Sequence, residues 1–89
     1  MRAILTVIGA DKVGIVAGVT QKLAELEINI LDISQTIMGA SFTMIMLCDL
    51  SHSKKDFGEL KDTLNQKGEE LGVKINMQRE EIFDAMHRI

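Results

Sequence analysis

The residues with the clearest chemical potential lie in one stretch, Asp11-Lys12-Val13-Gly14-Ile15-Val16, between an apolar run and a helical segment. A helix that begins after a polar turn presents backbone N–H groups without partners. Together with the helix dipole, these groups favour an anion such as a carboxylate or phosphate. Gly14 has no side chain, so a ligand can approach the backbone closely there. The alternative is structural: Asp11 caps the helix, and Gly14 only fits a tight turn.

Other reactive side chains form no convincing site. Cys48 is the only cysteine, which excludes an intrachain disulfide and a CxxC motif. His52 is close in sequence to Cys48 and Asp49, and these three residue types could bind a metal ion. His52 falls in a predicted loop, however, where a solvated histidine is the simpler interpretation. His87 stands alone on the last segment, as a cation near a helix end. We therefore expect no metal, no cofactor and no catalytic residues, and predict that the protein is not an enzyme.

Composition narrows the function classes. The chain has 89 residues, 46% of them hydrophobic, which indicates one globular domain with a modest core. A net charge of −3, three Phe and no Trp or Tyr argue against nucleic-acid binding. No apolar run approaches the roughly 20 residues that span a bilayer, and the N-terminus lacks a signal-peptide pattern. We expect a cytoplasmic protein without a membrane partner.

Periodicity in the first half predicts a strand, a helix and a hairpin. Residues 2–9 are apolar on both alternating faces, as in a central strand. Residues 13–26 repeat apolar positions at helical spacing, and Gly18 within them suggests close packing against another element. Residues 28–38 alternate with one polar face, which suits an edge strand or a subunit interface. After a turn at residues 39–41, residues 42–50 form a strand that is apolar on both faces.

The second half predicts a helix, a strand and a further helical segment. Ser53, with Asp56 three residues later, is a capping pattern for a helix that ends at Gly72. Residues 73–79 alternate cleanly as a half-exposed strand. Residues 80–89 are predicted to be helical and to cover apolar sheet surface. The buried stripe of the helix that ends at Gly72 is Phe57, Leu60, Leu64 and Leu71, and that of the last segment is Ile82, Phe83, Met86 and Ile89.

The element order predicts an α+β fold, a ferredoxin-like βαββαβ sandwich whose four-stranded antiparallel sheet carries two helices on one face. Residues 1–79 would form the domain and residues 80–89 its C-terminal helical extension. The first and third strands are apolar on both faces, so the second sheet face needs a cover. The C-terminal helix, a partner subunit or both are the candidates, and we expect a homodimer or larger homo-oligomer. The methionines Met38, Met44 and Met46 suit either core filling or a partner surface.

With these motifs in this order, the chain resembles an ACT domain, the small ligand-sensing module of amino-acid metabolism, over about residues 2–79. The first motif is Asp11 to Val16, and the second is Glu27-Ile28-Asn29-Ile30. The hairpin from Ser34 to Met44 is similar to that of glycine-cleavage-repressor ACT domains, and the whole chain is similar to free-standing ACT proteins of bacteria and archaea. Two positions depart from the pattern: Val13 stands where Pro is frequent, and Asp11 where ligand-binding members often carry Asn.

The resemblance implies an amino-acid site between two subunits. The N–H groups near the helix start would take the ligand carboxylate, the Asp11 carboxylate would accept from its ammonium group, and the Asn29 amide can hold either. The structural alternative makes Asn29 a turn residue. The residues implied are Asp11, Val13, Gly14 and Ile15 from one chain and Asn29 and Ile30 from its partner.

Two functions from different classes follow. One is a non-catalytic, allosteric regulatory protein that senses a small molecule, above all an amino acid, at a dimer interface. The other is a ligand-free interaction or oligomerisation module that regulates a partner enzyme or transcription regulator. An acylphosphatase-like enzyme shares the element order but needs an Arg in the first turn, where only Lys12 is basic.

Overall fold

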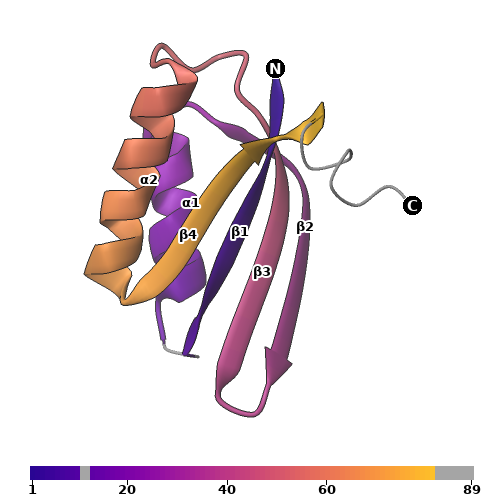
Figure 1. The fold of residues 1–89 in the computed structure, drawn as a ribbon, viewed down its shortest axis with the longest axis vertical. Coiled ribbons are helices and arrows are strands. Elements are labelled where there is room, and N and C mark those ends of the chain that lie inside the picture. The colour runs from indigo at the N-terminus through magenta and orange to yellow at the C-terminus, as the bar shows by residue number, and fades with distance from the viewer. Residues whose placement is uncertain (11–12, 82–89) are drawn as a thin grey trace.

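The computed structural model describes residues 1–10 and 13–81. Their sheet has the strand order β2-β3-β1-β4 with every neighbouring pair antiparallel, and the two helices lie on one face of it (Figure 1). This is the predicted ferredoxin-like arrangement. The elements are β1 (Arg2–Ala10), α1 (Ile15–Glu25), β2 (Asn29–Met38), β3 (Ser41–Asp49), α2 (Phe57–Leu71) and β4 (Val73–Arg79).

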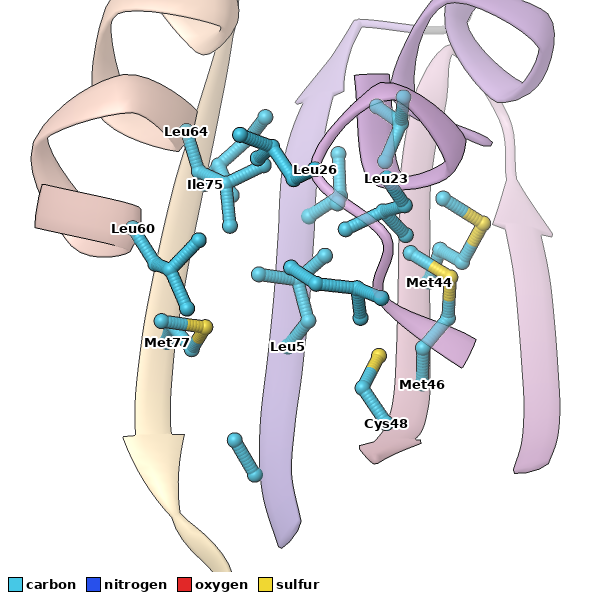
Figure 2. Packing of buried hydrophobic residues seen from close by; sticks show 14 of the residues in the cluster. Leu5, Leu23, Leu26, Met44, Met46, Cys48, Leu60, Leu64, Ile75 and Met77 are labelled. Carbon is cyan, nitrogen blue, oxygen red and sulfur yellow. The ribbon is translucent and has the colours of Figure 1, made fainter. Parts of the chain in front are cut away.

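The core fills the space between the helices and one face of the sheet (Figure 2). Alternation in β1, β3 and β4 sends every second side chain to this face, as expected for strands with one packed side. The predicted helical stripes supply the other wall, with Leu23 and Leu26 from the first helical segment and Leu60 and Leu64 from α2. The sheet contributes Ala3, Leu5, Val7, Phe42, Met44, Met46, Cys48, Val73, Ile75 and Met77.

The packing role predicted for Gly18 is confirmed. A Cβ atom added at Gly18 would lie 2.9 Å from Cδ2 of Leu71, which is closer than real Cβ contacts allow. A larger residue at this position would therefore require at least the Leu71 side chain to shift where α1 meets the C-terminal turn of α2. Met44 and Met46 fill the core, as one of the two predicted roles requires, whereas Met38 is 73% exposed.

The start of α2 differs from the prediction. The N-cap is Asp56, whose Oδ1 accepts a 2.8 Å hydrogen bond from the N–H of Glu59, and not Ser53. Asp56 is followed three residues later by Glu59, so it has the capping spacing itself and stands directly before the apolar stripe. Gly72 ends the helix in the left-handed conformation, as predicted.

The opposite sheet face, which we call the open face, is only partly shielded by the described residues. β1 is central, as predicted, but the expectation that both of its faces are covered is met on the helix side alone, since Ile8 is 50% exposed. Ile45 of β3 is 40% exposed on the same face. Residues 1–10 and 13–81 by themselves therefore leave apolar surface on the open face.

The predicted C-terminal helix falls largely outside the described residues. β4 ends at Arg79, and the backbone turns helical at Glu80 and Glu81. Residues 82–89, which carry the predicted apolar stripe, are not among the described residues. Within the described ranges, neither helix is long and apolar enough to cross a membrane.

Candidate functional site

The first half of the candidate site is the turn into α1. Gly14 is the N-cap of this helix and has φ 91° and ψ −3°. This is a left-handed backbone conformation that residues other than glycine rarely adopt. The first intrahelical hydrogen bond runs from the N–H of Gly18 to the carbonyl of Gly14, at 2.8 Å. Such a start leaves the N–H groups of the three residues between them without partners inside the helix. A carboxylate at the turn would meet these donors and the positive end of the helix dipole.

Side chains at this turn contribute less than its backbone. Val13 is fully exposed, and an added Cβ atom at Gly14 would have no neighbour within 4 Å among residues 1–10 and 13–81. Ile15 is only 2% exposed, so its side chain belongs to the core and only its backbone N–H is a candidate for ligand binding. Asp11 and Lys12 lie outside the described residues. The N-cap position itself falls to Gly14 rather than to Asp11.

The second half is the start of β2. Asn29 is exposed and is the first residue of the strand, opposite Asp49 of β3, so it is not the turn residue of the structural alternative. The turn precedes it and includes Glu27, whose φ is 60°. Ile30 lies opposite Cys48 and packs against the core, so its side chain positions the strand more than it faces solvent.

One chain does not bring the two halves together. The register pairs Asn29 with Asp49 and Asp49 with Arg2, at the beginning of β1. The Gly14 turn follows Ala10, at the end of the same strand. Arg2 and Ala10 are eight residues apart along β1, so the two halves of the candidate site lie about 26 Å apart along the strand direction. In Figure 1 the chain accordingly leaves β1 for α1 at one end of the sheet, while β2 begins at the other.

Asp49, which the sequence analysis considered only next to Cys48 and His52, lies opposite Asn29. Asp49 Oδ1 accepts hydrogen bonds from Ser51 Oγ at 2.6 Å and from the Ser51 N–H at 3.0 Å. These bonds lower the pKa of the Asp49 carboxyl below its ordinary value. The signal was an Asp followed two residues later by Ser, which is typical of an Asx turn. The Asn29 half of the site therefore borders a fixed negative charge.

The remaining reactive groups do not form a second site in the described part of the chain. Burial raises the pKa of the Cys48 thiol to about 11, so the thiolate that reacts or binds metal is disfavoured. His52 is exposed. Among residues 1–10 and 13–81, no three His, Cys, Asp or Glu side chains are grouped so as to hold a metal ion.

Comparison with known proteins identifies the fold's family. The ACT domain family model matches residues 2–78. A UPF0237 protein from Listeria innocua is 66% identical over the full length of both chains. Among solved structures, an ACT domain protein from Streptococcus pneumoniae superimposes with a TM-score of 0.84 at 50% identity, covering 98% of each chain.

A more distant neighbour also supports the predicted kind of ACT domain. A putative glycine cleavage system transcriptional repressor superimposes with a TM-score of 0.75 at 25% identity, covering 86% of this chain and 44% of its own. ACT domains are regulatory, ligand-binding modules, as the resemblance implied. The family match over nearly the whole length, the Gly14 turn and the strand order lead to one conclusion: this chain belongs to the ACT domain family.

Proposed function

We propose that the protein is a regulatory sensor that binds a free amino acid between two copies of the chain. The Gly14 turn of one copy and Asn29 of the other would form each site. The observation that carries the proposal is the placement of these two halves at opposite ends of one sheet. A two-fold partner that runs antiparallel brings each half to the same end as the partner's complementary half.

The exposed edge of β2 supports such a pairing. All ten residues of β2 are described and none is buried, although the strand is rich in large apolar side chains. A long, exposed and apolar edge strand is a template for pairing with another chain. The exposed apolar residues are Leu31, Ile33, Ile37 and Met38, which range from 44% to 73% exposed.

The chemistry of the two halves suits a zwitterion. The backbone N–H groups at the start of α1 would bind the ligand carboxylate, and the Asp11 carboxylate would accept from its ammonium group. Asn29 offers a donor and an acceptor from the partner. The charge on Asp49 beside Asn29 favours the ammonium end of the ligand on that side.

The same exposed edge also favours the second candidate function, a ligand-free module that binds a partner protein by strand addition. The two functions differ in what fills the turn at Gly14. A sensor needs an anion there, whereas an interaction module needs only the edge of β2.

A thermal-shift screen of the protein against single free amino acids tests the proposal. A ligand that binds only the native state raises stability, by about 2.7 kcal/mol at one hundred times its Kd. We expect at least one amino acid to raise the melting temperature in proportion to the logarithm of its concentration. Its amide, which lacks the carboxylate, should not. No shift with any amino acid would contradict the sensor and leave the interaction module.

A further inference from the structure

The open face carries a row of apolar residues at the centre of the sheet. In register, Ile4 of β1 lies opposite Leu47 of β3, and Ile45 lies opposite Thr6. Because paired residues of antiparallel strands share a face, these side chains form one surface on the side away from the helices. Burial of each such side chain stabilises a protein, so a segment that covers this row would gain stability from the apolar area it removes from water.

A hollow of about 260 Å³ lies over part of this row. Its lining residues are Ile4, Asp32, Ser34, Ile45, Leu47 and Glu80. The floor is apolar, while two carboxylates stand at its rim, one on β2 and one just after β4. This combination fits an amphipathic segment that also carries a cation.

Two charged residues of the chain, Arg2 and Glu80, form an ion pair on the open face beside this hollow. Arg2 lies on the open face, since it alternates with the buried Ala3. Its guanidinium is 2.8 Å from the Glu80 carboxylate, which ties the residue that follows β4 to the beginning of β1. Glu80 therefore stands over the sheet, and the remaining chain starts from there.

We propose that residues 82–89 of the same chain lie across the hollow and cover this part of the open face. Their apolar side chains recur at helical spacing, and eight residues in a helix span about 12 Å. Two interstrand spacings, from β1 over β3 to β2, amount to about 10 Å. The segment then ends beside Asp32, where Arg88 meets the carboxylate on the far rim. The inference is independent of the proposed ligand.

Methyl NMR on the full chain tests this placement. With Met and Ile methyl groups labelled, we expect nuclear Overhauser effects from the Met86 methyl to Ile45 and Ile4, and none to Ile37 on the opposite face. The effects should disappear when chains labelled only at Met are refolded with chains labelled only at Ile. Absence of the Met86 contacts, or their persistence in the mixed sample, overturns the proposal, and the second result assigns the open face to another copy.

A matched pair of substitutions sharpens the test. Ile45 and Ile33 are 40% and 45% exposed on neighbouring strands, but on opposite faces of the sheet. We expect Ile45→Asp to abolish the contact between Met86 and Ile4, and Ile33→Asp to preserve it. An equal effect of the two variants contradicts the proposal.

A second variant pair leaves the apolar floor intact, in case Ile45→Asp impairs folding. Arg88→Glu places a second carboxylate beside Asp32, and should weaken the contact between Met86 and Ile4 at least severalfold. Adding Asp32→Arg to that variant restores an opposite-charge pair and should recover the contact. Failure of the double variant to recover it argues against the placement of Arg88 at this rim.

Discussion

The two edge strands of the sheet, β4 and β2, differ in how deeply their side chains are buried. Val73, Ile75 and Met77 of β4 are all buried under the helices, whereas within the described chain no residue of β2 is buried. Even Ile33 and Ile37, which share the helix side of the sheet with the core, are 45% and 50% exposed. The described residues therefore bury one face of the β4 edge and leave the β2 edge exposed.

The two edges also differ in their protection against association. β4 carries Lys74 and Arg79 among seven residues, and charged side chains are a common device that keeps an edge free. β2 carries one charge, Asp32, among ten residues and has no proline. The unprotected edge is also the strand that begins with Asn29, so the more exposed of the two edges carries half of the candidate site.

The largest expected effect is a difference in the free energy of unfolding between core substitutions on β4 and on β2. Ile75→Ala removes a core side chain that is 4% exposed, and should lower the free energy of unfolding by about 2–5 kcal/mol. Ile33→Ala should cost less than half as much, because that side chain is already half in water. Urea denaturation at low protein concentration measures both. Equal losses would mean that β2 is packed like β4.

The next effect concerns the turn that the partner's β2 would meet. Gly14→Val forces a branched side chain into φ 91° and should destabilise the protein by about 1–3 kcal/mol, although the space around it is open. Gly14→Asn should cost less, since asparagine tolerates this conformation. Thermal unfolding of both variants is the measurement. If Val and Asn behave alike, backbone conformation is not what requires glycine there.

A third prediction tests the association of β2 directly. Ile33→Lys together with Ile37→Lys should raise the dissociation constant of the homodimer at least tenfold, equivalent to about 1.4 kcal/mol. Asn76→Lys on the β4 edge is the control and should leave association unchanged. Sedimentation equilibrium gives both constants. A doubly substituted protein that dimerises as tightly as wild type would exclude β2 as the interface.

The smallest effect lies at the Asn29 end of the sheet. Hydrogen bonds from Ser51 lower the pKa of Asp49 from 3.8 in the folded state, so this stabilisation is present above that pH and is lost as pH falls through the folded-state value. Ser51→Ala should therefore melt lower than wild type at neutral pH, and the difference should vanish in strong acid. Ser53→Ala is the control. A difference that is independent of pH would show that Asp49 is not its cause.

Local patterns predicted most of the fold. Alternation and helical spacing gave the element order, because each segment has one clear apolar period and a turn signal at its end. The start of α2 was misplaced by three residues, since Ser53 and Asp56 both have acceptor side chains and only the packing of Phe57 and Leu60 selects between them. The bulge between Ile30 and Asp32 has no comparable signal, because it depends on how β2 pairs with β3.

The candidate site was predictable only in part. The glycine pattern indicated the turn at Gly14, and the resemblance supplied Asn29, but periodicity does not tell where two segments lie relative to each other. Their placement at opposite ends follows from the register of three strands. The burial of Ile15 likewise depends on packing and leaves only its backbone for a ligand. Asp11 stays a prediction, because it lies outside the described residues.

Complementation in mixed dimers tests the shared site most directly. Once the screen has identified a ligand, Gly14→Val and Asn29→Ala chains are each expected to form dimers that do not bind it. Refolded together, they should give heterodimers with one intact site, made from the unaltered Gly14 turn of one chain and the unaltered Asn29 of the other. Calorimetric titration of purified heterodimers should therefore find one ligand per dimer, against two for wild type. Heterodimers that bind no ligand would contradict a site built from both chains.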